Sequence, residues 1–215
     1  MGSALGLIAN LLHPRTSEIG NVEAFLRRVA ESTTWVGDHI GILFAVLLVL
    51  GGLTAIYRSL AAEPSAAWAR LGFVGAVVGA GVLFVLMGTD GIAMKGLAKA
   101  WATAPETEKA AALRVASAVA EINLALFSVF IILFFGATFI LYGLAVLTSN
   151  AYPRWLGWVA VLAGLASALI GLNQAYRGPS VLVTNVLFVI FSVILTLWVL
   201  VMAVILWRKA SAPSV

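Results

Sequence analysis

The residues of this chain that could do chemistry gather at one end of its long apolar stretches. His39, Asp90 and Glu121 are of the types that exchange protons, so they are the candidates for acid–base catalysis. Further polar side chains at the same end could bind a polar head group: Asp38, Asn123, Asn173, Gln174, Arg177 and Asn185. We name the end that carries all these residues the polar end.

His39 is the strongest single candidate. Its neighbour Asp38 points about 100° away on a helix, so we expect Asp90 or Glu121 from another helix to be its partner. In an enzyme, one of these two carboxyl groups would donate a proton and His39 would accept one. The alternative is that His39 only bonds a carbonyl where its helix begins.

No metal or cofactor is predicted. His13 and His39 could join Asp90 or Glu121 around a metal, but no pair has ligand spacing such as HxxxH. His13 precedes Pro14 after an apolar segment, a place typical of residues that face lipid head groups. The chain has no cysteine, which excludes disulfides and thiolate chemistry.

The apolar stretches that position these groups make this an all-α membrane protein. Hydrophobic residues are 62% and charged residues 10% of the 215, and the mean hydropathy is +1.07. Backbone groups in lipid must bond within their own segment, so each stretch should be a transmembrane helix of one five-helix bundle, residues 34–209. The predicted spans are 35–57, 68–88, 118–147, 155–174 and 181–207.

Two further pieces should cap the polar end. The N-terminal segment 1–33 holds an apolar stretch, 3–12, too short to span, and an amphipathic helix in which Val22, Phe25, Leu26 and Val29 share one face. Between spans two and three, 89–117 predicts a helical hairpin broken at Pro105. Its second helix should run into span three as one rod of about 40 residues, roughly 60 Å long.

Charge indicates orientation and limits the partners. Short loops opposite the polar end carry Arg58, Arg70, Arg154, Arg208 and Lys209, so that side should be cytoplasmic and the N-terminus outside, with a short tail at 210–215. Lys95 and Lys99, one turn apart, indicate a solvated face. Because Lys and Arg are scattered, the net charge of +4 predicts no nucleic-acid partner. Membrane lipids and an amphiphilic small molecule are the expected partners.

Small residues mark two helix faces. Gly75 and Gly79 form a GxxxG pair, and small residues recur along span four at 157, 160, 164, 168 and 171. Such faces let helix backbones approach closely. They either pack inside one subunit or form a seam between subunits of a homo-oligomer.

Five short motifs carry a resemblance to a known kind of protein. They are Leu12-His13-Pro14, Trp35 with His39 four residues later, Gly88-Thr89-Asp90-Gly91, the run 152–158 (YPRWLGW) and Leu206-Trp207-Arg208. With them, the whole chain resembles small bacterial multipass membrane proteins that are known as domains of unknown function. The resemblance implies a bacterial cytoplasmic membrane and the same architecture, and it directs attention to His13, His39 and Asp90. It implies no activity.

Two interpretations of the polar end are open: the polar residues mark only where helices reach water, or they line a covered pocket. No charge occurs at mid-depth of any span, which argues against an ion channel or a classical secondary transporter. Three functions remain: a protein that binds a lipid-like molecule in an outward-facing pocket, an acid–base enzyme such as an isoprenoid cyclase or isomerase, or an assembly partner of another membrane protein.

Overall fold

The computed structural model describes residues 2, 5, 20–61 and 65–211. Within these residues the chain is almost entirely helical and has no β-strand. The expectations for His13, for the tail beyond 211 and for the apolar segment 3–12, apart from Leu5, lie outside the described residues.

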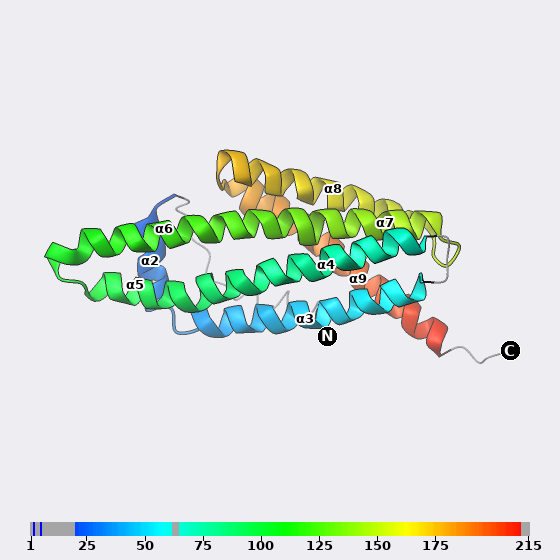
Figure 1. The fold of residues 1–215 in the computed structure, drawn as a ribbon, viewed down its shortest axis with the longest axis horizontal. Helices are drawn as coiled ribbons and strands as arrows, with labels where there is room; N and C mark the ends of the chain where they lie inside the picture. The colour runs from blue at the N-terminus through cyan, green and yellow to red at the C-terminus, as the bar shows by residue number, and fades with distance from the viewer. Residues whose placement is uncertain (1, 3–4, 6–19, 62–64, 212–215) are drawn as a thin grey trace.

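Five helices are long and apolar enough to cross a membrane, which confirms an all-α membrane bundle. They are Trp35–Ser59 (α3), Ala66–Thr103, Glu106–Thr148, Arg154–Arg177 (α8) and Val181–Ala210. The helices run side by side along the long axis of the molecule, and the second and third extend furthest at the polar end (Figure 1).

The second long helix differs from the prediction. The sequence predicts a span ending at Gly88 and a separate helix from Gly91, but α4 (Ala66–Leu86) continues through a π-helical turn, η1 (Met87–Ala93), into α5 (Met94–Thr103). Gly88 and Gly91 both lie within this π-helical turn, which contains the whole Gly-Thr-Asp-Gly motif. Asp90 therefore lies within a helix and not in a loop.

The third long helix is the rod that the sequence predicts. It comprises α6 (Glu106–Phe130), the π turn η2 (Ile131–Ala137) and α7 (Thr138–Thr148), 43 residues in all. The chain reverses before it at Pro105, whose ψ angle is 152°. Glu106 and Glu108 lie in the first turn of α6, where negative charge favours the helix dipole.

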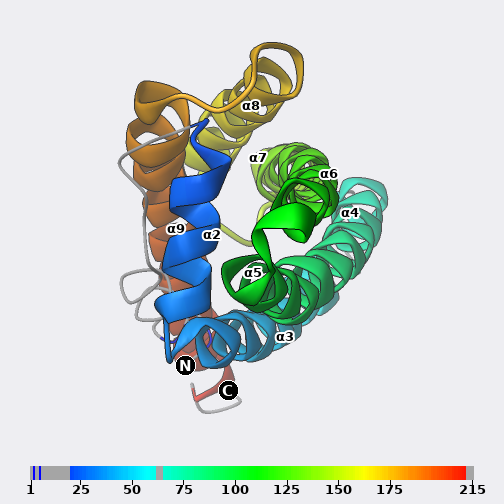
Figure 2. The same ribbon diagram turned by 90° about the vertical axis from the view of Figure 1, so that its left-hand side faces the viewer.

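The amphipathic helix is α2 (Val22–Glu31), which begins at Asn21, whose side chain accepts a hydrogen bond from the N–H of Ala24 at 3.0 Å. Leu26 and Val29 are buried against α5 and α6. Seen along the bundle, α2 lies across the polar end beside α5 (Figure 2).

The prediction that Lys95 lies on a solvated face is wrong. Its ammonium group donates to the carbonyls of Val29, Ala30 and Ser32, at 2.7, 3.0 and 2.5 Å. These carbonyls have no partner inside α2 because the helix ends there, so a cation from α5 satisfies them. Lys95 thus fastens α2 to the bundle, while Lys99 is exposed.

The fifth long helix also begins with a π turn, η3 (Val181–Leu187), which leads into α9 (Phe188–Ala210). The glycine faces are filled within the chain. A Cβ added at Gly79 would lie 2.8 Å from Cβ of Phe134, and one added at Gly157 would lie 2.8 Å from the carbonyl oxygen of Gly143. Only glycine allows α4 and α8 to approach the third long helix this closely.

The half of the bundle remote from the polar end contains buried aromatic residues whose polar atoms bond to neighbouring helices. Tyr142 donates from its hydroxyl to the carbonyl of Leu53 at 2.9 Å, and the indole N–H of Trp198 donates to the carbonyl of Leu156 at 2.8 Å. All four residues are buried. Aromatic residues can be buried here because their polar atoms have partners.

Candidate functional site

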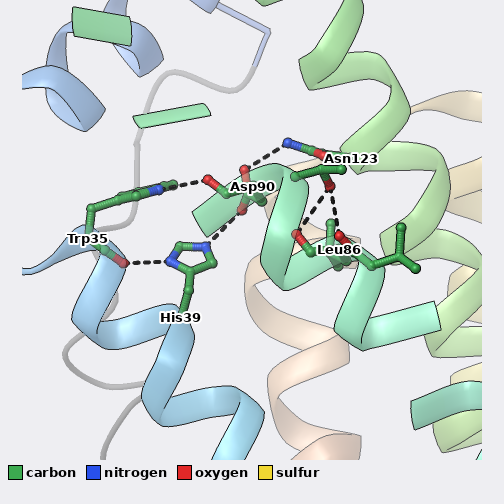
Figure 3. Close-up of polar contacts among 7 residues, drawn as sticks. Trp35, His39, Leu86, Asp90 and Asn123 are labelled. Carbon is green, nitrogen blue, oxygen red and sulfur yellow. Dashed lines mark hydrogen bonds and ion pairs between the residues drawn. The ribbon is translucent and has the colours of Figure 1, made fainter. Parts of the chain in front are cut away.

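Asp90 is the centre of a hydrogen-bonded cluster that joins three helices (Figure 3). Its carboxylate oxygen Oδ2 lies 3.0 Å from Nε2 of His39 on α3, and Oδ1 accepts from the Asn123 amide on α6 at 3.0 Å. Its backbone carbonyl accepts from the indole N–H of Trp35 at 2.8 Å. Of the two carboxylates expected as partners of His39, Asp90 is the one in contact.

The Trp-x-x-x-His motif fixes the histidine ring. Residues four apart lie on one helix face, and Nδ1 of His39 lies 2.7 Å from the carbonyl of Trp35. A carbonyl only accepts, so Nδ1 must carry a hydrogen. Because Nε2 faces a carboxylate oxygen, the hydrogen bond between His39 and Asp90 also needs a proton. The pair therefore holds one transferable proton, on either the imidazole or the carboxyl group.

Gly91 permits this contact. A Cβ at position 91 would lie 2.5 Å from Cβ of His39 and 2.8 Å from Cγ, distances that side-chain atoms do not adopt. Thr89 donates from its hydroxyl to the carbonyls of Val85 and Leu86, both at 3.2 Å, and so supplies bonds that a widened turn loses. The Gly-Thr-Asp-Gly motif and the Trp-x-x-x-His motif are two halves of one site.

The cluster borders a cavity of about 550 Å³. Four of the five long helices and α2 line it, and none of its described lining residues comes from α8. Phenylalanines form much of the apolar wall: Phe127, Phe130, Phe134, Phe135, Phe139 and Phe188. The polar lining comes mostly from the polar end: Asn21, His39, Asp90, Glu121, Asn123, Thr184 and Asn185. The cavity is therefore apolar over most of its depth and polar at one end.

Asn123 is the one member of the cluster with an unsatisfied atom. The residue is 6% exposed, and its Oδ1 has no hydrogen-bond partner among the described residues. Turning the amide over would place that oxygen against a carboxylate oxygen of Asp90, so the contact with Asp90 fixes the orientation. Asn123 also lines the cavity, so this buried acceptor belongs to a residue of the cavity wall.

A second polar cluster lies around Gln174 on α8. Its Nε2 donates to the hydroxyl of Ser128 on α6 at 3.1 Å, and its Oε1 accepts from the hydroxyl of Thr184 on η3 at 3.1 Å. Gln174 is buried and does not line the cavity. Both polar atoms of its amide have partners, so Gln174 connects three helices and does not itself offer a group to a ligand.

The remaining predicted site residues are spread around the polar end. Asp38 accepts from the hydroxyl of Thr34 at 2.9 Å and faces away from His39. Glu121 is exposed and Asn185 is half-buried, and both line the cavity. Asn173 is half-buried and Arg177 is exposed, and neither lines the cavity. The structure therefore joins His39, Asp90 and Asn123 directly, places Glu121 and Asn185 nearby, and leaves Asp38, Asn173 and Arg177 apart.

The sequence did not predict that Trp35 orients His39 or that the phenylalanines line a cavity. Trp35 stands in the same motif as His39, and this spacing could have indicated that its backbone orients the ring. The phenylalanines occur in runs that any lipid-facing helix contains, so their inward direction has no signal in the sequence. The three π turns have none either.

Comparison with known proteins gives a family but no activity. The model of a domain of unknown function, DUF4386, matches residues 1–203. The chain belongs to this family. No curated protein and no solved structure matches the chain.

Proposed function

We propose that this member of the DUF4386 family binds an amphiphilic small molecule in the cavity, with its apolar part among the phenylalanines and its head group beside Asp90 and Asn123. The volume of about 550 Å³ falls in the range of roughly 300–1,000 Å³ that small-molecule sites occupy. Such sites combine apolar walls with a few convergent polar groups, which is the composition of this cavity.

The unpaired Oδ1 of Asn123 is the observation that carries this proposal. A buried polar atom without a partner costs about 1–3 kcal/mol, and folded proteins rarely keep one. Here the residue that carries the atom lines the cavity. A bound head group that donates to it would remove the cost.

We also propose that the polar end faces the outside of the bacterial cytoplasmic membrane. The opposite end carries Arg58, Arg70, Arg154, Arg208 and Lys209, in keeping with the excess of positive charge in cytoplasmic loops. Residues of α2, including Val22 and Phe25, line the cavity from the polar end. In this orientation α2 covers a chamber that a ligand reaches from the outer leaflet or from outside.

The test is to identify what the chain carries after purification. Ser192 lines the cavity, so Ser192→Trp should fill part of it, whereas Val204 on the same helix is 48% exposed and Val204→Trp should not. We expect native mass spectrometry of the parent and of Val204→Trp to show one retained amphiphile, and Ser192→Trp to have lost it. An empty parent, or equal retention by both variants, would contradict the proposal.

The proton held between His39 and Asp90 supports acid–base catalysis as a second candidate. Both ring nitrogens of His39 are bonded inside the protein, and Asp90 lines the cavity. Asp90 would therefore transfer the proton, and His39 would be a positioning residue, in place of the acceptor role that the sequence suggests. This assignment changes which variant should lose activity.

Hydrogen exchange separates an enzyme from a binding protein. If the site protonates its ligand at carbon, incubation in D2O should add deuterium to the retained molecule. Asp90→Asn should abolish this incorporation, and Asp38→Asn, which changes a carboxylate outside the cavity, should preserve it. A ligand that stays free of deuterium in the parent would leave binding as the function.

A further inference from the structure

We infer that the head group held at Asp90 and Asn123 is a hydrogen-bond donor without negative charge, either an amine or a hydroxyl group. This inference rests on the proposed binding function and adds the chemical class of the ligand. It follows from the hydrogen-bond donors and acceptors that the described lining residues offer to a ligand.

The acidic and amide groups of the site offer acceptors. Oδ1 of Asn123 has no described partner, and the two oxygens of Asp90 each have one side-chain partner although a carboxylate oxygen can accept two bonds. Glu121 adds a carboxylate at the rim. A ligand that supplies hydrogens would satisfy these atoms, and a ligand that only accepts would not.

The hydroxyl groups along the wall direct their hydrogens into the protein. Ser192 donates to the carbonyl of Val189 at 2.9 Å, and Thr196 donates to the carbonyl of Ser192 at 2.7 Å. Thr184 donates to Gln174 at 3.1 Å. Each hydroxyl has one hydrogen, so all three have only lone pairs left for a ligand.

Few donors remain. The indole N–H of Trp35 and both nitrogens of His39 are bonded within the cluster. Among the described lining side chains other than Asn21, the uncommitted hydrogens belong to the Asn185 amide and to the second N–H of Asn123. The cavity therefore presents more acceptors than donors to its contents.

The charged residues near the cavity also favour a head group without negative charge. No Lys or Arg is among the described residues that line the cavity. Lys95 is engaged by the end of α2, and Arg177 lies outside the lining. A carboxylate or phosphate head group would lie near Glu121 and find no Lys or Arg among these residues, which is costly in a site of low dielectric. An ammonium group would find a counter-charge in Glu121 and hydrogen-bond acceptors in Asp90 and Asn123.

The experiment compares amphiphiles that differ only in the head group. Dodecylamine, dodecanol and dodecanoate are titrated onto the purified full chain in neutral detergent, and binding is measured by native mass spectrometry. The cavity-filled Ser192→Trp supplies the background of non-specific uptake. We expect the amine and the alcohol to bind about tenfold or more tightly than the carboxylate, because an ionised carboxylate has no hydrogen to donate and is repelled by Glu121.

Two variants test which groups select the ligand. Asn123→Leu removes the unpaired acceptor and should weaken both the amine and the alcohol about tenfold. Glu121→Gln changes an exposed residue, so it should fold normally, and it should weaken the amine while leaving the alcohol unchanged. This difference distinguishes attraction by charge from hydrogen bonding alone.

The outcomes separate the two proposals. Dodecanoate bound as tightly as the other two would overturn the inference about the head group and leave the binding function in place. If none of the three binds the parent above the Ser192→Trp background, the binding function fails and the inference fails with it.

Discussion

The clusters around Asp90 and Gln174 each contain a buried side-chain amide, both join three helices and both take a member from α6. In the Gln174 cluster each polar atom of the central amide has a partner, and Gln174 has no place in the cavity lining. In the Asp90 cluster an acceptor is left over, and it belongs to a residue that lines the cavity. Both clusters contain a buried side-chain amide, Asn123 in one and Gln174 in the other, so the completeness of the hydrogen bonding, and not the presence of a buried amide, separates a structural cluster from a candidate site.

Removing the shared acceptor should have the largest effect. Asp90→Ala leaves Nε2 of His39 and the Asn123 amide without their partner, and each lost bond leaves a buried group unsatisfied. We expect the free energy of unfolding, measured by SDS titration in mixed micelles, to fall by about 3 kcal/mol. Asp38→Ala loses only a bond to Thr34, so its free energy of unfolding should fall by less than about 1 kcal/mol. Equal losses would show that the Asp90 cluster does not hold the helices together.

A methyl group added at Gly91, between the two halves of the site, should have the second largest effect on the free energy of unfolding. Gly91→Ala pushes α3 away from η1, and we expect a loss of about 2 kcal/mol. The matched control is Gly88→Ala in the same π turn, where an added Cβ would meet nothing within 4 Å and should be neutral or slightly stabilising. Unfolding of both variants in the same micelles checks the contrast. A tolerated Gly91→Ala would mean that His39 can move without cost.

Replacing each amide by leucine tests the comparison directly. Gln174→Leu leaves the hydroxyls of Ser128 and Thr184 without their partner and should destabilise by about 1–2 kcal/mol, with no loss of ligand. Asn123→Leu loses one bond but also removes the unsatisfied oxygen, so its unfolding free energy should change by less than about 1 kcal/mol. Ligand retention should fall only in Asn123→Leu. The reverse pattern would place the binding site at Gln174.

Releasing the cover over the cavity should have the smallest effect on overall stability. Lys95→Met removes the cation that bonds the last carbonyls of α2, and Lys99→Met is the exposed control on the same helix. We expect hydrogen exchange of the amides in 22–31 to speed up about tenfold in Lys95→Met alone, because local opening then costs less. Unchanged exchange would show that the apolar face of α2 is sufficient to hold it.

Hydropathy and helix periodicity predicted the membrane architecture because both are local properties of the sequence. The five spans, the rod through Glu121 and the amphipathic helix 22–31 follow from them. The interruption expected between Gly88 and Gly91 was wrong, since a π turn carries the helix across glycines that usually end one. The solvated face expected for Lys95 was wrong because its partners are backbone carbonyls of α2, about 65 residues away in the chain.

The candidate site was predictable only in part. That His39 would meet a carboxylate from another helix follows from the depth at which both residues lie, and depth can be counted along a helix. The rotation of each helix about its own axis cannot be obtained by counting residues. Whether Asn123, Gln174 and Arg177 face one another or point apart depends on the turn of each helix about its axis, which the π turns and the glycine contacts set.

The three π turns of the described chain all contribute to the cavity lining: η1 through Met87 and Asp90, η2 through Phe134 and Phe135, and η3 through Thr184 and Asn185. Each π turn accommodates one residue more than an α-helical turn does. Deleting the additional residue from one of them would return it to an α-helical turn and leave the residues beyond it facing the same way, whereas one residue deleted from an ordinary α-helix rotates everything beyond it by about 100° and shifts it by about 1.5 Å. The π turns are therefore the places where these helices can change in length by one residue without turning the cavity-lining residues that lie beyond them.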